Sequence, residues 1–145
     1  MIRFDEDVRI QMEKHAVADF PDECCGFLFG LENADGLRTI SVLQEVVNAK
    51  EGDKRRRFEI TPKDYIKAEN FAISSDLLFL GIYHSHPNHP AIPSEHDRAA
   101  AQPYFSYVII SVMQGDVSHT RSWRLNDESI FEEEQMTNTQ INQFT

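Results

Sequence analysis

A continuous apolar run from Leu77 to Tyr83, followed at once by His84-Ser85-His86, constrains this chain more than any other stretch. An apolar run of this length is typical of a β-strand that is buried on both faces. The two histidines then lie at the end of that strand. Because side chains two residues apart on an extended chain point to the same side, His84 and His86 can converge on one metal ion, while Ser85 faces away.

After the histidines, three prolines interrupt regular structure, and Ser94-Glu95-His96-Asp97 then begins a short predicted helix. The Asp97 carboxylate can turn back from the first helical turn to complete a site of two histidines and one carboxylate. With water in the fourth position, this is the arrangement of a catalytic zinc centre. Ser94-x-x-Asp97 is also a capping-box pattern, and the two interpretations are compatible because a cap would hold the ligand in place.

The spacing of these residues resembles the signature of the JAMM (MPN-plus) family of zinc metalloproteases. That family also uses a glutamate just before a short hydrophobic strand, and the segment from Pro21 to Gly30 resembles this element, with Glu23 at the glutamate position. Residues 57–64, 107–112 and 121–125 resemble the small bacterial branch of the family. The resemblance predicts one JAMM/MPN-plus domain over residues 1–134.

The resemblance implies a zinc metallopeptidase and a role for each residue. His84, His86 and Asp97 would bind one Zn²⁺ per chain, Glu23 would be the general base, and Ser94 would donate a hydrogen bond to the oxyanion. The small bacterial relatives trim the C-terminus of ubiquitin-like sulfur-carrier proteins. The expected partner is therefore a carrier whose Gly-Gly tail enters the cleft, as an added β-strand beside the active-site sheet.

Other functions stay open at this point. Zinc-activated water attacks peptide, isopeptide and ester bonds alike, so a deubiquitinase-type isopeptidase is an alternative, although the chain is short for the insertions with which eukaryotic relatives grip linked ubiquitin. A non-catalytic MPN scaffold is a second alternative, but such scaffolds lack the metal ligands. A cytidine deaminase would need His-x-Glu and Pro-Cys-x-x-Cys, and neither motif occurs. His89 and His96 lie near the motif and are expected at the surface.

The composition of the chain limits the classes of partner that it is expected to bind and the location where it is expected. The 145 residues include 24 acidic and 14 basic side chains, for a formal net charge of −10, which argues against nucleic acid or an anionic membrane as partner. No stretch approaches the roughly 20 apolar residues that span a bilayer, and the first residues lack the apolar core of a signal peptide, so a cytoplasmic location is expected. Residues 49–57 form a local positive patch, either a solvated loop or a docking surface. The adjacent Cys24 and Cys25 are interpreted as buried strand thiols.

The remaining pattern predicts an α/β fold, with a single mixed β-sheet, partly barrel-like, flanked by helices. The family resemblance implies the same JAMM/MPN (cytidine-deaminase-like) architecture. Helices are predicted over residues 5–20 and 61–74 on opposite faces of the sheet. The expected strands are 24–31, 37–48, 77–83, 104–113 and 117–125, with a last strand or an acidic cap over 126–134. The polar tail 135–145 is expected to be disordered.

Overall fold

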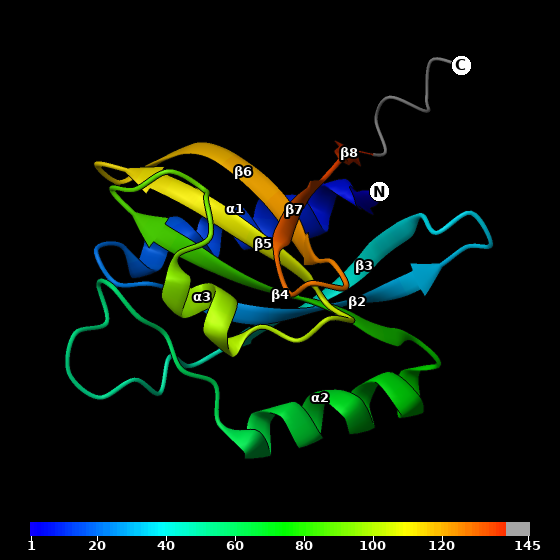
Figure 1. The fold of residues 1–145 in the computed structure, drawn as a ribbon. Coiled ribbons are helices and arrows are strands. Elements are labelled where there is room, and N and C mark those ends of the chain that lie inside the picture. The colour runs from blue at the N-terminus through cyan, green and yellow to red at the C-terminus, as the bar shows by residue number, and fades with distance from the viewer. Residues whose placement is uncertain (139–145) are drawn as a thin grey trace.

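The computed structural model describes residues 1–138. They form a curved, partly barrel-like mixed sheet of eight strands with helices on both faces (Figure 1). The strands follow one another in the order β7-β6-β5-β4-β2-β3-β1-β8. The elements are β1 (Ile2–Phe4), α1 (Glu6–Asp19), β2 (Cys25–Glu32), β3 (Arg38–Val46), α2 (Pro62–Ser75), β4 (Leu78–Pro87), α3 (Glu95–Ala100), β5 (Ser106–Met113), β6 (Asp116–Leu125), β7 (Phe131–Glu134) and β8 (Met136–Asn138).

β4 is the central strand of the sheet, as the apolar run predicts. It pairs with β5 in parallel and with β2 antiparallel. Every residue of β4 after Leu78 is buried, because helices cover both sides of the sheet at this point. The strand continues past the apolar run to Pro87. The backbone of His84, Ser85 and His86 is therefore part of the parallel pairing with β5.

The two faces of the sheet carry separate hydrophobic clusters, each covered by one of the long helices. On one face, the α1 stripe of Val8, Met12 and Ala16 packs against the sheet. On the other face, Ala68 and Ala72 of α2 pack against aromatic side chains of β2 and β4. This confirms that the two helices lie on opposite faces.

The start and end of α2 follow from local chemistry. The Thr61 hydroxyl oxygen accepts a hydrogen bond from the Asp64 amide at 3.2 Å, and Pro62 occupies the first helical position. Asp76 ends the helix in the left-handed conformation, with φ of 58°. The structure thereby confirms the predicted start at Thr61.

Two strands at one edge of the sheet were not predicted. β1 pairs in parallel with both β3 and β8, and each of these edge strands has only three residues, too few for an alternating pattern to be recognisable. Residues 136–138 therefore differ from the expected disordered tail, and the partly buried Met136 packs against the core. The rest of that tail, 139–145, lies outside the described residues. Of the two alternatives for 126–134, the structure has the strand, β7.

The helices within residues 1–138 include none with the length and apolar character needed to cross a membrane.

Gly26 on β2 generates a stability prediction, because the Tyr83 ring lies directly over it. A methyl group at Gly26 would overlap that ring, and the Tyr83 hydroxyl is hydrogen-bonded to His15 Nδ1 at 2.6 Å, which holds the ring in place. We expect Gly26→Ala to lower the free energy of unfolding by about 1–3 kcal/mol, as overpacking usually does. Urea unfolding measures the change, and the cost should shrink in a Tyr83→Leu background, where the overlap is relieved. Equal costs in both backgrounds would contradict this explanation.

Candidate metal centre and cleft

The end of β4 presents two imidazoles on one face of the sheet. His84 and His86 alternate with Ser85, and the structure confirms that Ser85 points to the opposite face. There its hydroxyl oxygen accepts a hydrogen bond from the Cys24 amide at 2.8 Å. His84 is almost fully buried and His86 is 8% exposed. The two Nε2 atoms lie 3.1 Å apart.

Asp97 reaches the same point from the start of α3. The Ser94 hydroxyl oxygen accepts a hydrogen bond from the Asp97 amide at 3.0 Å, and the Ser94 amide donates to Asp97 Oδ2 at 2.9 Å. These two bonds form a complete capping box. The cap fixes the carboxylate so that Oδ2 lies 3.3 Å from His84 Nε2 and 3.1 Å from His86 Nε2.

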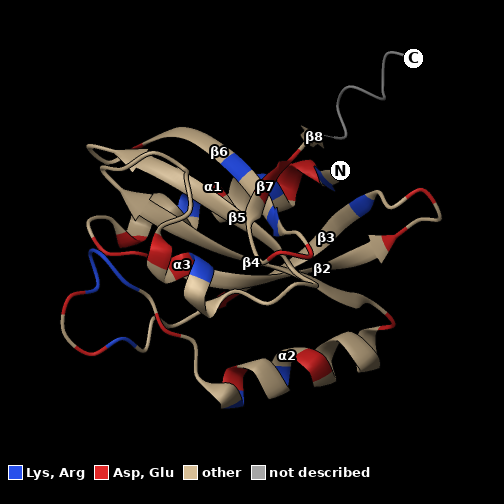
Figure 2. Cartoon of the chain, viewed as in Figure 1, with Lys and Arg blue, Asp and Glu red and all other residues tan. Residues whose placement is uncertain are grey.

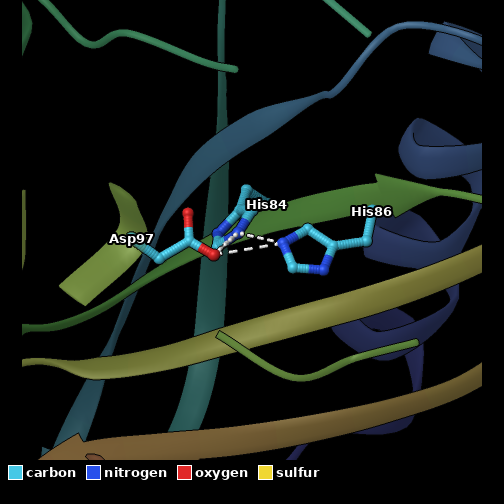
Figure 3. Close-up of side chains that lie close together, drawn as sticks. All are labelled: His84, His86 and Asp97. Carbon is cyan, nitrogen blue, oxygen red and sulfur yellow. Dashed lines mark hydrogen bonds and ion pairs between the residues drawn. The ribbon is translucent and has the colours of Figure 1, made fainter. Parts of the chain in front are cut away.

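The three donor atoms form a nearly equilateral triangle that fits a zinc ion (Figure 3). In a tetrahedral site with bonds of 2.0 Å, neighbouring ligand atoms are about 3.3 Å apart, close to the separations seen here. Two imidazole nitrogens and a carboxylate oxygen are also a usual donor set for catalytic zinc. The Pro90 carbonyl oxygen lies 2.9 Å from His86 Nδ1 and accepts its hydrogen, which leaves the Nε2 lone pair free for the ion.

The pKa shifts of two of these groups favour metal binding, and the shift of the third opposes it. Burial lowers the pKa of His84, which favours its neutral form. Burial alone would raise the pKa of Asp97, but the interactions of its carboxylate with His84 and His86 outweigh burial and hold that pKa well below its usual range. Burial lowers the pKa of His86, but the hydrogen bonds to Asp97 and to the Pro90 carbonyl raise it more, so metal binding must displace a proton at this residue. A neutral imidazole and an ionised carboxylate are the forms that bind a metal ion.

Glu23 lies beside this group because of strand register. Cys25 of β2 pairs with His84 of β4, and continuing that antiparallel register places Glu23 opposite His86. The Glu23 side chain is buried, at 4% exposure. Burial raises its pKa to about 8, against the opposing effect of the His86 charge. A carboxyl group that can hold or release a proton near neutral pH therefore lies beside His86.

Two hollows flank the donor triangle. The first, here called the arginine cleft, lies on the Glu23 side and is lined by Glu23, Arg55, Arg56, Arg57, His86, Pro87, His89, Pro90, Ile92 and Ser94. The second, here called the apolar pocket, lies on the His84 side and is lined by Lys50, Phe58, Glu59, Ile60, Tyr65, Ile82, His84, His96, Asp97, Ala100 and Tyr107. The donor triangle is thus reached from two sides of different chemical character.

The remaining residues that the sequence singles out differ in their exposure to solvent. Ser94 lies at the exposed rim of the arginine cleft, where it caps α3. His89 and His96 are exposed, as expected. Cys24 and Cys25 are buried free thiols, and burial raises the pKa of Cys24 to about 12.

Sequence reasoning missed two residues that shape the site. The Phe58 ring stacks on His84, with centroids 4.5 Å apart and planes at 26°. Asn48 donates one hydrogen bond to the Glu23 carbonyl oxygen and another to that of Arg57, each at 3.1 Å. Both lie at the borders of the charged loop, where the local sequence has no periodic pattern to indicate burial.

Comparison with known proteins shows where the chain belongs. Prokaryotic homologues of the JAB domain match residues 5–126. A CysO-cysteine peptidase from Mycobacterium tuberculosis is 31% identical over 123 residues, covering 84% of this chain and 81% of that protein. A desampylase from Haloferax volcanii is 33% identical over 97 residues, covering 66% of this chain and 67% of that protein.

Similar solved structures support the same fold. The solution structure of a protein from Desulfitobacterium hafniense matches with a TM-score of 0.83 and 27% identity, covering 96% of this chain and 93% of the other. A crystal structure of a JAB1/MPN domain protein from Archaeoglobus fulgidus matches with a TM-score of 0.57 and 13% identity, covering 96% and 97%, which supports the fold alone. The match to residues 5–126 and the similarity to the mycobacterial relative together show that this chain belongs to the family of prokaryotic JAB-domain (JAMM/MPN) proteins.

Proposed function

We propose that this protein is a zinc-dependent peptidase that cleaves the bond after the C-terminal Gly-Gly of a ubiquitin-like sulfur-carrier protein. One observation carries the proposal: three metal-type donor atoms lie within 3.3 Å of one another, and the buried carboxyl group of Glu23 shares a cleft with one of the three donor residues, His86. The names of the relatives, a CysO-cysteine peptidase and a desampylase, support the reaction class.

In this proposal His84, His86 and Asp97 hold one Zn²⁺. When bound, zinc makes a water molecule acidic enough to attack at neutral pH and polarises the scissile carbonyl. The protein supplies the alignment, since the capping box fixes Asp97 and the Pro90 carbonyl fixes the His86 ring.

Glu23 moves the proton. It accepts one hydrogen from the attacking water and delivers it to the leaving nitrogen as the carbon–nitrogen bond breaks. The products are the carrier, ending in a Gly carboxylate, and a released amine. The raised pKa of Glu23, caused by burial, suits a group that must both take and give a proton.

Ser94 is proposed as the donor to the oxyanion. Its hydroxyl oxygen accepts the Asp97 amide hydrogen, so its own hydrogen remains available for donation. Its place at the rim of the arginine cleft puts it beside His86 and Glu23. Removing a comparable donor elsewhere costs about 3 kcal/mol of transition-state stabilisation.

The scaffold alternative is disfavoured by the same geometry. An assembly module has no need for two imidazole nitrogens and a carboxylate oxygen that converge within 3.3 Å of one another. The isopeptidase alternative draws support from the desampylase relative, and it differs from the main proposal only in the leaving group.

The first prediction concerns metal content. We expect about one zinc per chain in the native protein and a large loss of zinc in His84→Ala and Asp97→Asn, because each removes one of three ligands. Elemental analysis of purified protein measures this. The matched control is His89→Ala, an exposed histidine of the same loop, which should keep its zinc. Full zinc content in His84→Ala would refute the assigned ligand set.

The second prediction concerns Glu23. Glu23→Gln should retain zinc but lower kcat by at least about 100-fold, because the side chain no longer accepts a proton. The assay is cleavage of a ubiquitin-like carrier extended beyond Gly-Gly. Asp22→Asn is the control, since it removes a neighbouring carboxylate that does not line the arginine cleft. A fully active Glu23→Gln enzyme would refute the assignment of Glu23 as the general base.

The third prediction concerns pH and stability without metal. Burial raises the pKa of Glu23 from an ordinary value of 4.5 to about 8 in the folded protein. The group therefore favours folding below pH 4.5, and that contribution is lost as the pH rises to about 8. In chelator-treated protein, Glu23→Gln should gain stability relative to the native chain across this window, by on the order of 3 kcal/mol. Urea unfolding at pH 5 and pH 8 measures the difference, and an equal difference at both values would contradict the burial argument.

A further inference from the structure

The chemistry of the proposed reaction identifies which hollow receives the leaving group. Glu23 must protonate the departing nitrogen, so the leaving group lies on the Glu23 side of the donor triangle. That side is the arginine cleft. The acyl side of the substrate, with its narrow Gly-Gly chain, would then lie in the apolar pocket, whose lining includes Phe58 and Tyr107. This step rests on the proposed function.

The loop that carries the arginines is attached to the backbone of Glu23 at two points. The Glu23 amide donates to the Lys54 carbonyl oxygen at 2.7 Å. Asn48 Nδ2 bridges the carbonyl oxygens of Glu23 and Arg57. Because these bonds lie at the two ends of the arginine run, they hold its backbone beside the proposed general base.

The arginine cleft has unbalanced positive charge in a protein of net charge −10. Figure 2 shows several basic residues on this loop between β3 and α2, interspersed with acidic ones. Among the ion pairs of residues 1–138, Arg56 has only Asp53 at 3.9 Å, and neither Arg55 nor Arg57 has a carboxylate partner. Among the described residues that line the cleft, Glu23 is the one acid, against three arginines. The cleft therefore suits a ligand with negative charge.

We propose that Arg55, Arg56 and Arg57 form a subsite for the free α-carboxylate of the leaving group, so that the enzyme removes a single amino acid from the carrier. In a released amino acid the carboxylate oxygens lie only about 3 Å from the amine nitrogen, which places them beside Glu23. Guanidinium groups match carboxylates in shape and charge. Arg57 is the principal candidate, since it is half-buried and its carbonyl oxygen is held by Asn48.

A leaving group joined through a lysine side chain fits this subsite poorly. In an isopeptide bond the departing nitrogen is separated from its own main chain by a four-carbon stem, and that main chain continues on both sides without a free carboxylate. The subsite thus favours trimming of a one-residue adduct over removal of a whole attached protein.

The test compares two substrates that differ only in the charge of the leaving group. One is a ubiquitin-like carrier ending in Gly-Gly-Cys with a free carboxylate, and the other is the same carrier with a C-terminal amide. The zinc-loaded native enzyme should prefer the acid by about tenfold to a hundredfold in kcat/KM, the range expected for a charge-assisted contact. The affinity of the Glu23→Gln protein for both carriers, measured by calorimetry without turnover, should show the same preference.

Substitutions in the loop test which side chain causes the preference for the acid over the amide. Arg57→Gln should bring the acid-to-amide ratio close to 1, while Arg57→Lys should keep part of it. The matched control is Lys54→Gln, which removes the same charge from the same loop, but whose side chain lines a different hollow, beside His15 and Asp19. That variant should keep the native ratio.

The outcomes separate this inference from the function on which it rests. Cleavage of neither carrier by zinc-loaded protein would overturn the proposed peptidase itself. Equal cleavage of acid and amide, or faster cleavage of an isopeptide-linked carrier, would overturn the carboxylate subsite and leave the peptidase standing. An equal loss of kcat/KM on both substrates in Arg57→Gln would also overturn the carboxylate subsite, because the arginines would then serve as a general docking surface for an acidic carrier.

Discussion

The pairing of β2 with β4 is the constraint on which the rest of the site depends. The Ser85 hydroxyl and backbone are both hydrogen-bonded to Cys24, at 2.8 and 3.2 Å, so the end of β4 is fixed against the start of β2. This register sets Glu23 opposite His86 although 62 intervening positions separate them in the chain. A shift by one residue would turn the imidazoles to the other face of the sheet and separate them from the carboxyl group.

Much of the centre could be predicted because its signals are local. The alternation of His84, Ser85 and His86 requires only extended backbone, and the capping box at Ser94 requires only the first turn of a helix. Thr61 and Pro62 likewise specify the start of α2 without reference to distant residues. In each case the determining contact lies within a few positions along the sequence, where propensity and periodicity are informative.

What could not be predicted depends on contacts between distant segments. The position of Glu23 follows from strand register, and the bridging role of Asn48 follows from the path of a loop that has no periodicity. The short strands β1 and β8 form only because β3 offers them an edge. The sequence indicates a positive patch in the charged loop, but the attachment of this loop to Glu23 depends on tertiary structure.

The double use of Asp97 links metal occupancy to local folding. α3 has six residues, none of them buried, so it gains little from hydrophobic packing, and its cap is the main local support. The same carboxylate oxygen that accepts from the Ser94 amide also faces both imidazoles. An ion bound there stabilises the folded form of this segment by mass action, and a loosened segment weakens the hold on the ion to the same extent. Order at the rim of the cleft and affinity for a metal ion at these donors are therefore thermodynamically linked, and a substitution that loosens α3 would lower both.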